Sequence, residues 1–289
     1  MHSTRVSHVS VHRPVRLRPG RVLTYLGLVV VSAIVVFPMY WMVLSAIQPQ
    51  HYILVFPPAL WPVGFNTDPL QELIQKHPIG LWLWNSTILA SIVTAICLVL
   101  TSLGAFALSR FRWTGKAAFG FLLLATQMMP GAVIIVPIQR LFRQFGMLEN
   151  LPSLALLQAA FVLPIGIWIL KGLFDSIPQE VVQAAYVDGC GDMGILGRIL
   201  LPLSVPGLVA VGVVAFFFSW NEFLFANTMV TRAELLPASD GLATLISELD
   251  TPVQLLLAAA VIFSVLPVVF YLVVQRFIIS GLTAGAVKG

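Results

Sequence analysis

Long runs of apolar residues, separated by short polar segments, dominate the chain. Six of these runs reach the roughly 20 residues that an α-helix needs to cross the hydrocarbon core of a bilayer. They extend over residues 22–47, 81–108, 117–139, 151–170, 203–225 and 253–275, and Glu222 is the only Asp, Glu, Lys or Arg inside them. The pattern predicts an all-α membrane protein with six transmembrane helices.

The composition excludes the soluble classes of protein. Of the 289 residues, 58% are hydrophobic and 10% are charged, and the mean hydropathy is +0.94. An average soluble domain has roughly 25% charged residues, so this much apolar surface does not fit inside globular cores. Only the N-terminal tail is basic, and no nucleic-acid partner is expected. Cys97 and Cys190 lack metal-ligand spacing and are expected to be small core residues.

The loops between the runs carry an uneven distribution of Lys and Arg. Because cytoplasmic loops hold the excess of these residues, the distribution predicts which side each loop faces. With both termini inside, the inside segments hold twelve of them: Arg5, Arg13, Arg16, Arg18, Arg21, Arg110, Arg112, Lys116, Lys171, Arg198, Arg276 and Lys288. The outside segments then hold four: Lys76, Arg140, Arg143 and Arg232. Both termini are therefore predicted to be cytoplasmic.

One membrane domain accounts for most of the chain. We expect a basic cytoplasmic tail over 1–21, a transmembrane domain over 22–280 and a cytoplasmic tail over 281–289. The first apolar run is longer than the 7–15 residues of a signal-peptide core, so we expect it to be retained as a helix. The longest inside loop, 171–202, is far longer than a turn between helices needs, and loops of this length are usually functional.

This inside loop predicts two short helices joined by a glycine turn. Ser176 with Gln179 three residues later forms a capping-box pattern, and helical periodicity then continues to residue 188. Gly189 supplies a residue that adopts the left-handed conformation at a helix end. Asp192 is placed to cap a second helix that runs to about Leu201, before the chain re-enters the membrane near Pro202.

The first of these helices carries a candidate docking face. Val181, Ala184, Ala185 and Asp188 share one face at three- and four-residue spacing, with Glu180 at its rim. Small alanine side chains let another backbone approach closely. The alternative is a helix lying on lipid headgroups, but such a helix carries Lys and Arg on its polar face, whereas this one is acidic.

The residues of the loop resemble the EAA loop of bacterial ABC-importer permeases. The motif here is Glu180-x-x-Gln183-Ala184-Ala185-x-x-Asp188-Gly189, followed by Pro202. Four other stretches are similar to the carbohydrate-uptake, MalG-like branch of that family: Asn85-Ser86, ALSRFRWTGK over 107–116, Trp220-Asn221-Glu222-Phe223, and Gln275-Arg276 with GLTAGAVKG over 281–289. The motif's first acid is replaced by Gln183, which removes a possible salt bridge but keeps size and hydrogen bonding.

The resemblance implies a multi-pass permease of the bacterial cytoplasmic (inner) membrane that imports sugars. Its expected partners are a second homologous permease, two cytoplasmic ATPase subunits, an extracytoplasmic solute-binding protein and the lipid bilayer. The residues expected to couple to the ATPases are Glu180, Gln183, Ala184, Ala185, Asp188, Gly189 and Pro202. ATP and Mg²⁺ would be bound by the ATPase subunits, with no cofactor in this chain.

Motifs for catalysis are missing from the sequence. There is no G-x-x-x-x-G-K-[ST] phosphate loop, no nucleophile elbow and no HExxH motif. The five histidines, at positions 2, 8, 12, 51 and 77, all lie outside the predicted spans. We therefore expect a non-catalytic transport subunit with no catalytic residue and no metal site.

The only acid inside a predicted span, Glu222, lies next to Trp220 and Asn221. Ionisable groups within membranes are costly and usually face a cavity or a partner. One interpretation is a translocation path, in which Trp220 stacks on a sugar ring and Asn221 hydrogen-bonds its hydroxyls. The other, which we favour, is a structural or gating role near the outer interface, with Trp220 as an anchor. Bends are expected at Pro38, Pro130, Pro137, Pro164 and Pro267.

Two other functions compete with the importer subunit. An ion-coupled secondary transporter acting alone would have inverted repeats and buried acids near the bilayer midplane, and neither is visible here. An intramembrane enzyme would need paired catalytic residues inside the spans. Uptake into liposomes by the purified chain without ATPase partners would separate the first alternative from the importer.

Overall fold

The computed structural model describes residues 19–53, 55–247 and 251–286, and the regular elements in these ranges are helices. This confirms the all-α prediction. The predicted N-terminal tail (1–21) lies almost entirely outside the described residues, as do residues 287–289 of the C-terminal tail. The helices are α1 (Pro19–Ile47), α2 (Asp68–Lys76), α3 (Ile79–Arg110), α4 (Lys116–Thr126), α5 (Gly131–Gln144), α6 (Leu151–Ser176), α7 (Gln179–Val187), α8 (Asp192–Ile195), α9 (Leu201–Leu203), α10 (Val205–Asn221), α11 (Leu224–Met229), α12 (Ala238–Ser247) and α13 (Val253–Ala286). Short turns of helix cover Gln50–Tyr52, Leu196–Leu200 and Ala233–Leu235.

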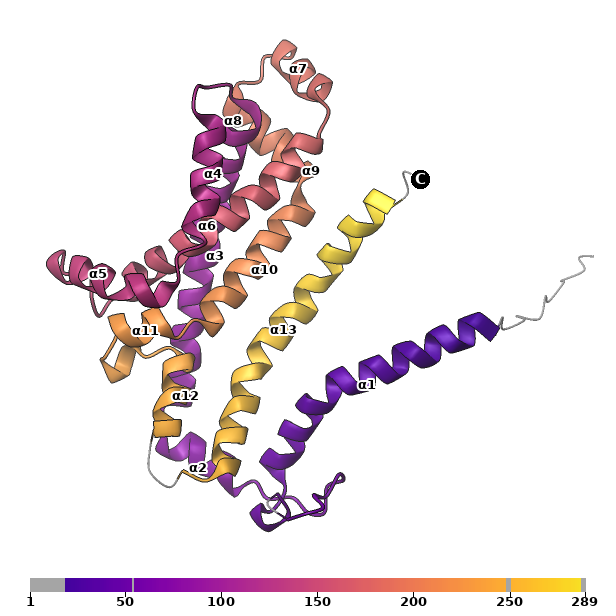
Figure 1. Ribbon diagram of the computed structural model, residues 1–289, viewed down its shortest axis with the longest axis vertical. Coiled ribbons are helices and arrows are strands. Elements are labelled where there is room, and N and C mark those ends of the chain that lie inside the picture. Colours follow the sequence, from indigo (N-terminus) through magenta and orange to yellow (C-terminus); the bar gives the residue numbers. More distant parts are fainter. Residues whose placement is uncertain (1–18, 54, 248–250, 287–289) are drawn as a thin grey trace, which may run out of the picture.

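Helices α3, α6 and α10 pack together as the centre of the bundle, and α13 lies along α10 (Figure 1). Small residues allow this close packing. A Cβ atom added to Gly166 of α6 would lie 2.4 Å from Thr101 of α3, and one added to Gly207 of α10 would lie 2.0 Å from Leu173 of α6. Cys97 is fully buried in the same core.

Among the described residues, four helices are long and apolar enough to cross a membrane: α1, α3, α6 and α13. The third predicted run, 117–139, is instead divided into α4 and α5, which meet at 99°. Pro130 explains the break, because a proline cannot donate a backbone hydrogen bond and disfavours helical conformation in the residue before it. The bend expected at Pro130 is therefore a complete break between two helices.

The fifth predicted run, 203–225, also differs from the prediction. It begins with an 83° bend at Ser204, between the helical stretch Asp192–Leu203 and α10. At its other end α10 stops at Asn221, four residues early, and a separate short helix, α11, follows. Counting each bent pair as one span gives up to six spans in the described part of the chain.

Helix α1 points away from the rest of the molecule over most of its length (Figure 1). Its side chains from Leu23 to Phe37 are exposed, and burial begins only near Leu44. Pro38, Pro137, Pro164 and Pro267 lie inside helices, where kinks were expected.

The bundle has two distinct ends. Helices α7 and α8 and the last turns of α13 lie at one end, which we call the α7 end, and α2 and α12 lie at the opposite end (Figure 1). At that opposite end the Asn85 side chain donates hydrogen bonds to the carbonyls of Glu234 (2.9 Å) and Leu236 (3.1 Å), and the Ser86 hydroxyl accepts one from the Ala238 N–H (2.8 Å). These bonds hold residues 234–238 against α3.

Candidate functional site: a surface helix and its attachment to the bundle

Helix α7 begins at Gln179 after the N-cap residue Pro178. The expected Ser176 cap was wrong: Ser176 is the last residue of α6, and its hydroxyl donates to the Leu173 carbonyl at 2.7 Å. The other end agrees with the prediction, because Gly189 has a φ of +82° immediately after α7. A residue without a Cβ adopts this left-handed conformation at little steric cost.

The two faces of α7 have different surroundings. Val182 and Ala185 are buried against Phe174 of α6 and a cluster that includes Ile195 and Leu200. Ala185 lies three residues after Val182, on the same side of the helix, and packs inward with it. The predicted docking face is therefore divided between the buried and the exposed sides of α7. The remaining coupling residues are exposed: Glu180, Gln183, Ala184, Asp188, Gly189 and Pro202.

The outward surface of α7 also carries apolar side chains. Val181 is 41% exposed and Val187 is 87% exposed. Together with Ala184 they leave α7 with a mixed apolar and acidic surface facing away from the bundle. Isolated exposed apolar residues are ordinary, but several of them on a nine-residue helix favour a contact with another protein.

A hydrogen bond ties α7 to the helix that follows it. The Tyr186 hydroxyl donates to the Asp192 carboxylate at 2.6 Å, and this bond raises the pKa of Tyr186. Asp192 was expected to cap the second helix, but it is the first residue of α8 and the cap position belongs to Gly191. The helical stretch then continues through Pro202 to Leu203.

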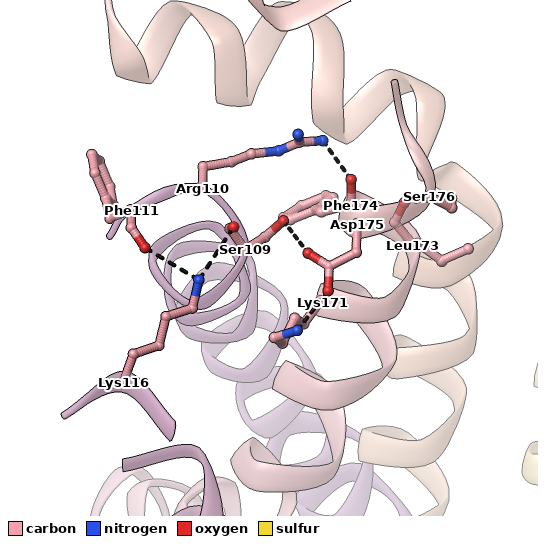
Figure 2. A network of polar contacts seen from close by, with 9 residues as sticks. All are labelled: Ser109, Arg110, Phe111, Lys116, Lys171, Leu173, Phe174, Asp175 and Ser176. Carbon is pink, nitrogen blue, oxygen red and sulfur yellow. Dashed lines mark hydrogen bonds and ion pairs between the residues drawn. The ribbon is translucent and has the colours of Figure 1, made fainter. Parts of the chain in front are cut away.

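Arg110, the last residue of α3, is hydrogen-bonded to the end of α6, the helix that precedes α7 in the chain (Figure 2). Its guanidinium donates hydrogen bonds to the Phe174 carbonyl, as Figure 2 shows, and to the Ile177 carbonyl at 3.2 Å. The Phe174 carbonyl also accepts from the Ile177 N–H at 3.2 Å, and a cation near the carbonyl end of a helix is favoured by the helix dipole. Arg110 therefore connects α3 to the last turn of α6 and to Ile177, two residues before α7 begins.

Asp175 makes a second connection between the same helices (Figure 2). Its carboxylate accepts hydrogen bonds from the Ser109 hydroxyl at 2.6 Å and from the Lys171 ammonium at 2.5 Å. Lys116, the first residue of α4, donates to the carbonyls of Ser109 (3.4 Å) and Phe111 (3.2 Å). The ends of α3 and α6 and the start of α4 thus form one joint.

No role in this joint was predicted for the stretch 107–116, although it contributed to the family resemblance. A cluster of basic residues directly after an apolar run is visible in the sequence, but it indicates only a cytoplasmic membrane boundary. The partners of Arg110 lie 64 and 67 residues away in the chain, and they are backbone carbonyls, which carry no sequence signal.

The three residues considered for a translocation path do not face one common cavity. Trp220 is fully buried, with its ring 5.8 Å from Phe216 and 5.3 Å from Phe263 between centroids. The Asn221 amide donates back to the Phe217 carbonyl at 2.8 Å. Glu222 follows the last residue of α10.

Glu222 connects three helices. Its carboxylate accepts hydrogen bonds from the backbone N–H groups of Phe225 (2.7 Å) and Ala226 (3.1 Å) at the start of α11. It also accepts one from the Gln158 amide of α6 at 3.1 Å, and Gln158 in turn accepts one from the Ser219 hydroxyl of α10 at 2.6 Å. Glu222 therefore caps the start of α11, directly after the end of α10. Through Gln158 it also connects these two helices to α6.

A cavity of about 550 Å³ lies between α3, α10 and α13, and it was not anticipated. Three hydroxyl side chains of α3 line it: Thr87, Ser91 and Thr94. Their spacing of four and three residues, which places them on one helix face, was the available signal. Phe216 and Phe270 form part of the opposite wall. Within the described ranges no three His, Cys, Asp or Glu residues are grouped to hold a metal ion.

Comparison with known proteins gives a consistent result. The chain is 31% identical over 272 residues to the diacetylchitobiose uptake system permease protein DasC of Streptomyces coelicolor, covering 93% of this chain and 98% of that protein. It is 30% identical over 273 residues to the trehalose/maltose transport system permease protein MalG of Thermococcus litoralis, covering 93% and 97%. In a crystal structure of a bacterial ABC transporter that imports alginate, one chain superposes with a TM-score of 0.74 at 21% identity, covering 91% of this chain and 99% of that one.

The match to a protein family spans most of the elements described above. Residues 100–282, from the last third of α3 to near the end of α13, match the family described as the binding-protein-dependent transport system inner membrane component. This range contains the joint, α7 and the Glu222 cap. The chain therefore belongs to the family of inner-membrane components of binding-protein-dependent transport systems.

Proposed function

We propose that this chain is a transmembrane permease subunit of an ATP-driven importer for carbohydrates, of di- or oligosaccharide size. Family membership supports the transport role, and the names of the relatives, for diacetylchitobiose and for trehalose and maltose, support the sugar. A second homologous permease would supply the other half of the translocation path. Two cytoplasmic ATPase subunits would bind ATP and Mg²⁺ and hydrolyse the ATP.

The geometry of α7 carries the mechanical part of this proposal. One face of the helix is buried on the bundle and the other is exposed, and the chain that leads into it is held by Arg110. Closure of the ATPase subunits against the exposed face would move α7. Because Arg110 and Asp175 join α6 to α3, the two longest central helices would move together as a rigid pair.

The orientation that this mechanism requires has the α7 end in the cytoplasm. The count of Lys and Arg supports it, since the helix ends and connecting segments on that side contain Arg110, Lys116, Lys171 and Arg198. The segments 48–80 and 226–252, which contain α2 and α12, would then face the solute-binding protein. The cavity on α3 is the surface we assign to the sugar path, because the hydroxyl oxygens of Thr87, Ser91 and Thr94, which donate to backbone carbonyls of α3, remain able to accept hydrogen bonds from a sugar.

Reconstitution tests the proposed function directly. Liposomes containing this chain with its partner permease, ATPase and binding protein should take up a labelled oligosaccharide only when ATP is present on the ATPase side. Liposomes containing this chain alone should take up none. Uptake by the chain alone, driven by an ion gradient, would establish the secondary-transporter alternative instead.

A further inference from the structure

A second cavity, of about 520 Å³, lies beside the joint, between the end of α3, the start of α4 and α6. Two tryptophans and two lysines line it, Trp113 with Lys116 and Trp168 with Lys171. Figure 2 shows the two lysines, each from a different helix, at the Ser109 region of the joint.

The ammonium groups retain hydrogen-bonding capacity. Each has three donors. Lys116 donates to two carbonyls, and Lys171 donates to the carboxylate of Asp175 and lies 5.4 Å from the centre of the Trp168 ring. At least one N–H of each lysine is left for a further acceptor, and two positive charges face the single negative charge of Asp175.

The rest of the wall suits the glycerol and acyl part of a lipid. Trp113 is 43% exposed and Trp168 is 36% exposed, and tryptophan rings favour the headgroup level of membranes. Beyond the cavity, α4 exposes Phe121 (73%) and Leu122 (60%), as expected of a surface facing hydrocarbon. The lysines therefore lie where an apolar surface meets a charged boundary.

We propose that this cavity binds an anionic phospholipid, with the lipid phosphate between Lys116 and Lys171 and the glycerol and upper acyl carbons against Trp113 and Trp168. Basic pockets of this kind on the cytoplasmic side of membrane proteins suit anionic headgroups. The leaflet follows from the orientation given under the proposed function. Because the same lysines hold Asp175 and the end of α3, a bound lipid would stiffen the joint that carries α7.

Native mass spectrometry of the assembled transporter tests the lipid site. Phosphatidylglycerol and phosphatidylcholine with the same acyl chains are titrated into the detergent-solubilised complex. We expect phosphatidylglycerol to bind more tightly, and the double variant Lys116→Gln/Lys171→Gln to bind it roughly 25-fold more weakly, a factor of about five for each lysine. Lys76→Gln makes the same change on an exposed lysine at the other end of the molecule and should leave binding unchanged.

A charge-neutral variant covers the case in which the double variant does not fold. Ala117 lines the cavity, so Ala117→Phe should obstruct it and weaken binding while both lysines remain. Equal binding of the two lipids, or unchanged binding by Ala117→Phe, would overturn the proposal. Competition by millimolar inorganic phosphate as strong as that by phosphatidylglycerol would also overturn it, in favour of a free anion. None of these readouts requires transport, so they stand apart from the test of the proposed function.

Discussion

Arg110 attaches the end of α6, and with it α7, to α3. Its guanidinium is a charged donor to the Phe174 carbonyl, which also accepts from the Ile177 N–H, and to the Ile177 carbonyl just after α6. Hydrogen bonds from a charged donor contribute more than neutral ones, about 1.5–3 kcal/mol in proteins. The neighbouring Arg112 is exposed and makes a natural comparison.

Arg110→Ala should separate ATP hydrolysis from transport. Without the guanidinium, movement of α7 would no longer be passed from α6 to α3, so we expect uptake by the reconstituted transporter to fall about tenfold or more, as loss of about 1.5–3 kcal/mol would allow. ATPase activity should persist. Arg112→Ala is the control and should keep both activities. Equal losses in the two variants would contradict a special role for Arg110.

Asp240 in α12 is a second residue whose surroundings make a measurable prediction. Its side chain is only 3% exposed. Burial, and after it the nearby Glu222 carboxylate, raise the pKa of Asp240 to about 7, against an ordinary value of 3.8. Between these two pH values Asp240 is therefore protonated in the folded protein and ionised in the unfolded chain.

The sign of the resulting pH dependence follows from this uptake of a proton on folding. The stabilising contribution is fully present below about pH 3.8 and is lost as the pH rises through about 7. Thermal unfolding of the solubilised protein should therefore occur at higher temperature at pH 5.5 than at pH 8. Asp240→Asn should flatten this difference, and an identical pH profile for the variant would show that Asp240 is not responsible.

At the scale of the element, the position of α7 depends on how its two ends are held. One end is held by the joint, and the other is turned by Gly189 in the left-handed region of φ. A β-branched residue is strained there by about 1–3 kcal/mol. Gly191, two residues further on, has an ordinary φ of −78° and open space around its Cα, so it provides a matched control.

Gly189→Val should uncouple the ATPase from uptake while the complex still assembles. Valine disfavours the left-handed φ of residue 189, so the backbone would leave α7 in a different direction. This change would shift the angle at which α7 meets the ATPase subunit. Gly191→Val should leave uptake close to the wild-type value. The measurements are co-purification of the ATPase subunits, ATP hydrolysis and oligosaccharide uptake. Full uptake by Gly189→Val would contradict the proposed transmission of movement from the ATPase through α7.

At the scale of the whole molecule, two features separate this chain from a simple six-helix bundle. Helix α1 leaves the bundle, with its side chains exposed over most of its length. Two of the six apolar runs are bent by 99° and 83°. The bends place α5 across the direction of the central helices (Figure 1).

The membrane orientation of the whole chain can be measured by cysteine labelling. In a Cys190→Ser background, Val187→Cys on α7 should react with a membrane-impermeant maleimide only when the cytoplasmic side is accessible. Ser247→Cys at the end of α12 should react only from the other side. Both positions are exposed. Labelling of the two positions from the same side would contradict the predicted topology.

The sequence could predict those features that depend on neighbours in the chain. Apolar runs of sufficient length specify helices that cross a membrane, and the glycine after α7 marks a helix end, because each depends on residues within a turn or two. The motif around Ala184 likewise identified the surface helix, since its spacing is local.

The tertiary structure alone decided which distant residues meet. Pro130 was expected to bend a helix but in fact divides it into two. Ala185 was expected on the docking face but is buried in an apolar cluster that includes residues of α6 and α8. Arg110 finds its carbonyl partners 64 and 67 residues away, and Glu222 finds Gln158 at a distance of 64 residues. Such contacts depend on how the helices pack in three dimensions, and no periodicity in a single chain encodes that packing.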